Sequence, residues 1–165
     1  MIDSWEKLKD KLDELKEKSG ADLSRDEDLS IAVMNLISLE EHFFFTAQKT
    51  GKPEYQHLLR ETREIRKEML ARLMPENEGE TWCIAKHLLA ASMRLMEVGT
   101  KQLTAENRVE AEKMFASAYK VYSLFWALRL KLLELKDLRV EQKPQPEGGW
   151  TTEEIVNRLV DCCKE

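Results

Sequence analysis

The placement of glycine and proline constrains this chain more than any other feature of its sequence. The 165 residues include only six glycines and four prolines, about half the share found in an average protein. Nearly all of them fall between long segments whose apolar residues recur every three or four positions, which is the period of an amphipathic helix. Because both residues disfavour a helix interior, the sequence predicts an all-α fold with turns at these positions.

Four long segments in the middle of the chain carry broad apolar faces. Capping residues and the intervening glycines and prolines set their limits, and they predict helices over residues 26–49, 53–73, 80–98 and 104–138. Gly99 is expected to cap the C-terminal end of the third helix. Because short loops join these helices, we expect antiparallel neighbours in a four-helix up-down bundle.

Narrower amphipathic segments flank the predicted bundle. Residues 1–22 are predicted to form an accessory helix with an apolar stripe of Trp5, Leu8, Leu12 and Leu15. The bundle core then occupies residues 23–140. Residues 141–150 contain two prolines and two glycines, and they are predicted to tether a short C-terminal helix over residues 151–165.

Charge and hydropathy exclude several classes of protein. The net charge of −5 repels nucleic acid and anionic membranes, and no stretch of 18 apolar residues predicts a membrane span. No basic region followed by an apolar one opens the chain, so we expect no secretory signal. The three cysteines are an odd number and imply no disulfide framework. We therefore expect a cytoplasmic protein that binds neither nucleic acid nor membrane.

Two charged residues fall on predicted core faces. Glu40 lies within the apolar stripe of helix 26–49, and Arg129 lies within that of helix 104–138. A buried carboxylate needs a partner and an arginine keeps its proton, so the two residues are candidates for one ion pair. Such a pair could fix the helix register, face a bound ligand, or lie exposed at an edge of the bundle.

A second group of polar residues shares one face of helix 80–98. Cys83 and His87 are four residues apart, a spacing at which both could hold one metal ion if a carboxylate such as Glu40 completed the site. Lys86, His87 and Arg94 could instead bind an anion or a small ligand. The third interpretation is a solvated polar stripe in which Cys83 is a small apolar filler.

Common catalytic templates do not fit the sequence. It lacks a glycine-rich phosphate loop, a Gly-x-Ser-x-Gly elbow and a His-Glu-x-x-His motif. The di-iron motif Glu-x-x-His occurs once, at Glu54 and His57, away from the predicted core face of its helix. That core face is expected to consist of Tyr55, Leu58, Ile65, Met69 and Leu73. We therefore expect no cofactor.

Three successive phenylalanines, residues 43–45, indicate a surface that needs covering. They turn through about 200° of a helix, so they cannot all face one core. We expect Phe45 to lie on the far side of its helix with Ile31 and Met34, where a second surface covers it. This pattern favours a homo-oligomer, preferably a dimer, or packing of this surface under the helix predicted within residues 1–22. The predicted interface comprises Ile31, Met34, Phe45, Trp5, Leu8, Leu12 and Leu15.

Two functions remain after these exclusions. The first is a non-enzymatic helical-bundle protein that acts as an assembly, scaffold or binding module through apolar helix faces, with a second copy or another protein as its partner. The alternative is a helical bundle with an internal small-ligand or metal site. That site would be built from Glu40, Cys83, Lys86, His87, Arg94 and Arg129. The first function predicts a metal-free multimer, and the second predicts a bound ion or ligand.

Overall fold

The computed structural model describes residues 23–75 and 80–132 and folds them into four helices. These are α2 (Leu23–Thr50), α3 (Pro53–Leu73), α4 (Thr81–Thr104) and α5 (Arg108–Arg129). The predicted all-α fold is confirmed for this part of the chain. The predicted helices within residues 1–22 and 151–165 and the tether 141–150 lie outside the described residues. None of the described helices is long and apolar enough to cross a membrane.

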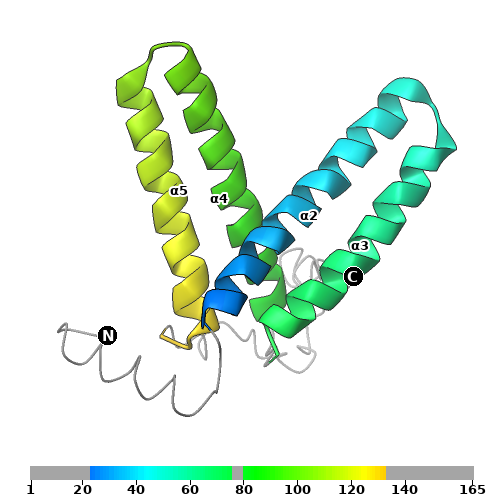
Figure 1. Ribbon diagram of the computed structural model, residues 1–165, viewed down its shortest axis with the longest axis horizontal. Helices are drawn as coiled ribbons and strands as arrows, with labels where there is room; N and C mark the ends of the chain where they lie inside the picture. The colour runs from blue at the N-terminus through cyan, green and yellow to red at the C-terminus, as the bar shows by residue number, and fades with distance from the viewer. Residues whose placement is uncertain (1–22, 76–79, 133–165) are drawn as a thin grey trace, which may run out of the picture.

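The four helices form two antiparallel hairpins. α2 packs along α3, and α4 packs along α5 (Figure 1). Gly51 ends α2, because its φ of 66° lets its amide donate to the carbonyl of Ala47 at 2.9 Å. Pro53 then begins α3 at the position where its missing amide hydrogen has no helical partner to lose. The predicted antiparallel pairing is confirmed for α2 with α3 and for α4 with α5.

The loop of the second hairpin begins with a Schellman motif. Glu106 has a φ of 60°, and its amide donates to the carbonyl of Leu103 at 3.0 Å. The amide of Asn107 donates to the carbonyl of Gln102 at 2.9 Å. These two bonds satisfy carbonyls that the end of α4 would leave without partners. A glutamate therefore occupies a left-handed conformation that glycine adopts at lower cost.

Replacing Glu106 with glycine is expected to raise the free energy of unfolding by about 0.5–1 kcal/mol, because glycine removes the steric cost of a positive φ. Urea unfolding of the two chains measures the difference. Ala105→Gly is the matched control, since Ala105 has an ordinary φ of −81°. A Glu106→Gly chain that is no more stable than the unmodified chain would contradict this account of the loop.

The predicted limits of the third and fourth bundle helices are wrong. Gly99 does not cap α4 but lies inside it, and Thr104 belongs to the last turn of α4. Phe115 of α5 packs on Gly99 so closely that an added Cβ would lie 2.6 Å from the ring. The glycine therefore permits a close approach of two helices. α5 ends at Arg129, well short of the predicted residue 138, because Lys131 takes a φ of 54° in a second Schellman motif.

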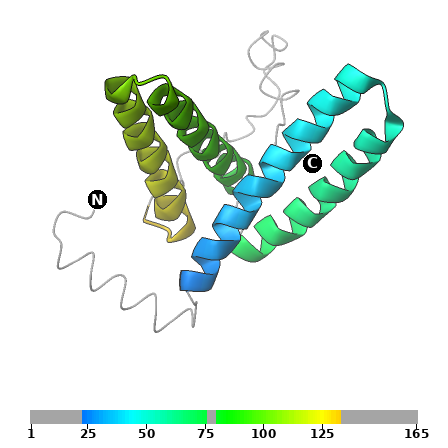
Figure 2. The same cartoon turned by 45° about the horizontal axis from the view of Figure 1, so that its top comes forward.

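The two hairpins meet at one end and diverge toward their loops. Both views show them as two arms of a V (Figures 1 and 2). The first residues of α2 lie beside the last residues of α5 at the joined end, and α2 also contacts α4. Within the described residues, the four helices share a core only at this joined end.

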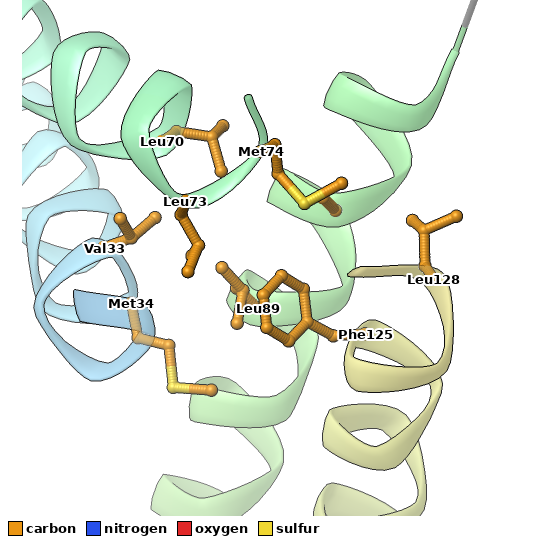
Figure 3. Packing of buried hydrophobic residues seen from close by; sticks show 9 residues of the cluster. Val33, Met34, Leu70, Leu73, Met74, Leu89, Phe125 and Leu128 are labelled. Atoms are coloured by element: carbon orange, nitrogen blue, oxygen red, sulfur yellow. The ribbon is translucent and has the colours of Figure 1, made fainter. Parts of the chain in front are cut away.

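We call this shared core the vertex core. Its residues come from all four helices and the residue that follows α3, and their side chains point toward one another (Figure 3). Removing them from water supplies the main force that holds the two hairpins together. The buried members are Val33, Met34, Leu70, Leu73, Met74, Ala85, Leu89, Phe125 and Leu128.

Met34 is a correction to the predicted interface. Its side chain lies within the vertex core beside Leu89 and Phe125 (Figure 3), and the residue is 2% exposed. A residue so deeply buried cannot contact another subunit. Met34 faces inward because α2 approaches the second hairpin on that side, a contact that the local sequence does not specify.

The buried face of α3 is also displaced from its predicted position. Leu58 is 40% exposed and Ile65 is 52% exposed, although both were assigned to the core. The buried residues of this helix are Thr62, Arg66, Leu70 and Leu73, of which Leu73 was predicted. The centre of the buried face therefore lies about 60° from its expected position, and this rotation brings an arginine into the interior.

Candidate functional site

The charge of Glu40 is balanced by Arg66 within the first hairpin. Arg66 is 1% exposed. Its Nε–H donates to Oε1 of Glu40 at 2.7 Å, and its Nη2–H donates to Oε2 at 3.3 Å. This two-point contact suits a planar guanidinium and a carboxylate. The pair joins the middle of α2 to α3, so it contributes to the register of the hairpin.

Arg129 has a different partner at the vertex. Its Nη2–H donates to Oδ2 of Asp26 at 2.8 Å, and Asp26 is 7% exposed. One turn further along α2, the hydroxyl groups of Ser30 and Tyr122 form a hydrogen bond of 2.7 Å. These contacts join α2 to α5 across the vertex. The structure therefore does not bring Glu40 and Arg129 together, because each is held by another residue.

Cys83 and His87 lie one turn apart on α4 but in different surroundings. Cys83 is 2% exposed, whereas His87 is exposed to solvent. A structural metal site needs several cysteine, histidine or carboxylate side chains close enough to bind the same ion. Among residues 23–75 and 80–132, no three His, Cys, Asp or Glu side chains come together in a way that could hold a metal ion.

Arg94 lies between two carboxylates. Its guanidinium contacts Glu41 of α2 and Glu97 of α4. An anion at this position would have to compete with both carboxylates. Lys86, on the same helix, is half-buried, and His87 beside it is exposed. The residues predicted to bind an anion or small ligand are therefore not gathered into one site, and Arg94 serves instead to link the two hairpins.

Phe44 and Phe45 lie beyond the contact between Glu41 and Arg94. They follow Glu41 by three and four residues, so they lie one turn farther along the same side of α2. One turn beyond Arg94, α4 carries Val98, which is 36% exposed.

Phe44 and Phe45 form a surface that we call the α2 aromatic patch. Phe44 is 48% exposed and Phe45 is 51% exposed. Their rings contact each other edge to face, with centroids 5.3 Å apart and an angle of 72° between the planes. Contiguous exposed apolar side chains of this kind mark partner-binding surfaces.

The remaining predicted interface residues differ in position. Ile31 is 44% exposed, on the vertex half of α2, and Phe45 belongs to the α2 aromatic patch. Trp5, Leu8, Leu12 and Leu15 lie outside the described residues. Phe45 and Ile31 are therefore the two predicted interface residues that the described part of the chain places on its surface.

Comparison with other proteins adds no relative. No protein-family model matches this sequence, and neither a curated protein nor a solved structure matches the chain. A function for the protein must therefore come from its own residues.

The predicted site and interface residues did not include Arg66, Glu41 or Phe44, although Phe44 belongs to the predicted run of exposed phenylalanines. A spacing of four links Thr62, Arg66 and Leu70, and this spacing was the signal that could have placed Arg66 in the interior. A charged residue is rarely assigned to a core, so the signal is easily overlooked. No local signal identifies the contact between Glu41 and Arg94, since it depends on how the two hairpins meet.

Proposed function

We propose that this protein is a non-enzymatic assembly module that forms a dimer through the α2 aromatic patch. One observation carries the proposal: Phe44 and Phe45 are about half exposed, and their rings contact each other to form one apolar surface. A second copy of the chain offers the same patch, and two such patches can cover each other.

The energetics favour a symmetric contact. Burying the exposed half of a phenylalanine side chain contributes about 1 kcal/mol. A dimer with two-fold symmetry uses each surface twice, so every favourable contact of one copy is made again by the other. Four phenylalanine rings would leave water together.

The alternative function, an internal ligand or metal site, has less support. Glu40 and Arg129 are each engaged by another residue, and Arg94 contacts two carboxylates. Cys83 is buried while His87 is exposed. Because the candidate residues point to separate surroundings, no observation favours this function over assembly.

Native mass spectrometry of the full chain tests the assembly proposal. We expect the unmodified chain to be a dimer at micromolar concentration, and the double variant Phe44→Ser with Phe45→Ser to be a monomer. Circular dichroism checks that each variant is folded. Ile65→Ser is the matched control, because Ile65 of α3 is 52% exposed and Phe45 is 51% exposed. A monomeric unmodified chain, or a folded double variant that remains dimeric, would overturn the proposal.

A further inference from the structure

One side of α2 carries a stripe of three residues, Glu41, Phe45 and Lys49, with an acid at one end and a base at the other. The charges of this stripe are complementary to those of an identical stripe that runs in the opposite direction. The three residues are four positions apart and all are exposed, so their side chains lie on successive turns of one side of α2. The acid and the base are equally far from the central phenylalanine. A helix with this pattern matches an identical helix that runs in the opposite direction.

We propose that two copies pair through α2 in antiparallel orientation, about a two-fold axis at Phe45. This inference rests on the proposed function and adds the register of the contact. Glu41 of each copy then faces the partner's Lys49, and the two Phe45 rings meet at the centre. Phe44, whose ring already contacts that of Phe45, extends the apolar centre on one side.

The charges select the antiparallel orientation over the parallel one. In a parallel pair, Glu41 would face the partner's Glu41 and Lys49 would face the partner's Lys49, and like charges in contact oppose association.

The intrachain contact of Glu41 is compatible with this arrangement. Arg94 contacts Oε2 of Glu41, and a carboxylate has lone pairs for more than one donor. The side chain of Glu41 is 45% exposed beside Arg94, so it remains accessible to a lysine from outside. Arg94 also restrains the carboxylate, which reduces the conformational entropy that Glu41 loses on binding.

Charge reversal at the two ends of the stripe tests the register. All chains carry Arg94→Gln, so that position 41 has no arginine beside it. We expect Glu41→Lys alone and Lys49→Glu alone each to weaken the dimer about tenfold, since either change makes both symmetric pairs repulsive. The chain with both substitutions should recover the original affinity. Lys52→Glu is the control, because exposed Lys52 lies beyond the end of α2, and it should leave the affinity unchanged.

A mixture of the two single variants gives the sharpest readout. One chain then carries two acids in the stripe and the other carries two bases, so we expect a heterodimer that is tighter than either homodimer. An affinity tag on one variant, with capture of the untagged variant, measures it. If Phe44→Ser with Phe45→Ser abolishes the dimer but the charge variants leave its affinity unchanged, the register is wrong while the assembly proposal stands. If the Arg94→Gln chain is monomeric, whether or not it also carries the charge substitutions at positions 41 and 49, the proposed register is wrong.

Discussion

Replacing Glu40 with alanine is expected to lower the free energy of unfolding by about 3–5 kcal/mol. The substitution removes the carboxylate that faces Arg66 and leaves the guanidinium in an interior where that residue is only 1% exposed. Because arginine does not lose its proton, the folded state carries the cost of a buried charge. Urea unfolding followed by circular dichroism measures the change.

Two controls separate the burial of charge from the loss of an ion pair. Glu40→Leu with Arg66→Met removes both charges and keeps the apolar volume, so we expect a stability close to that of the unmodified chain. Glu68→Ala breaks an ion pair with Arg72 whose side chains are 61% and 63% exposed, and it should cost only about 0.5 kcal/mol. An equally small loss for Glu40→Ala would contradict the buried pair.

Replacing Phe125 with alanine is expected to cost about 3–5 kcal/mol, the usual effect of a large cavity in a core. Phe125 is 0% exposed. Its ring stacks on that of Tyr122 at 6.1 Å and meets that of Trp126 edge to face at 5.5 Å. Because the vertex core contains residues of all four helices, removal of the Phe125 ring should destabilise both hairpins together. Urea unfolding detected by circular dichroism and by tryptophan fluorescence should give one transition.

Tyr119→Ala is the control for the vertex core. Tyr119 is an aromatic residue of the same helix but is 74% exposed, so its removal should change stability by less than about 0.5 kcal/mol. Comparable losses for Phe125→Ala and Tyr119→Ala would show that the vertex core does not hold the molecule together. Separate unfolding transitions for the two hairpins would lead to the same conclusion.

Helix content could be predicted because it depends on local chemistry. Gly51 and Pro53 act within their own turn of chain, and both serve as the pattern indicated. Gly99 shows where local reasoning fails. A glycine near the end of an apolar segment can cap a helix or let another helix approach, and only the position of Phe115 distinguishes the two roles.

The buried face of α3 shows a different limit. Apolar residues line two neighbouring sides of this helix, so the pattern alone allows either side to face the core. The side that is buried contains Arg66, whose burial is tolerable only because Glu40 lies opposite on α2. The prediction that Glu40 needs a partner was physically sound. The identity of the partner depended on the rotation of a second helix.

The divergence of the hairpins could not be read from the separate helices. An amphipathic pattern shows that a face is apolar, but it does not show which other face lies against it. Phe44 and Phe45 were recognised as part of a run that could not be wholly buried, and both are about half exposed. The contact between Glu41 and Arg94, which sets how far the hairpins stay together, depends on the placement of one hairpin against the other.

Cross-linking at position 48 tests the central claim, that two copies meet through α2, most directly. The chain carries Gln48→Cys, an exposed position one turn from Phe45 that leaves both phenylalanines in place, in a background where Cys83, Cys162 and Cys163 are alanine, and a short bis-maleimide is added to the folded protein. The account predicts that most of the chain becomes a covalent dimer, whereas Val109→Cys, at a residue that is 64% exposed on α5, remains monomeric. Equal cross-linking at both positions, or none at position 48, would contradict it.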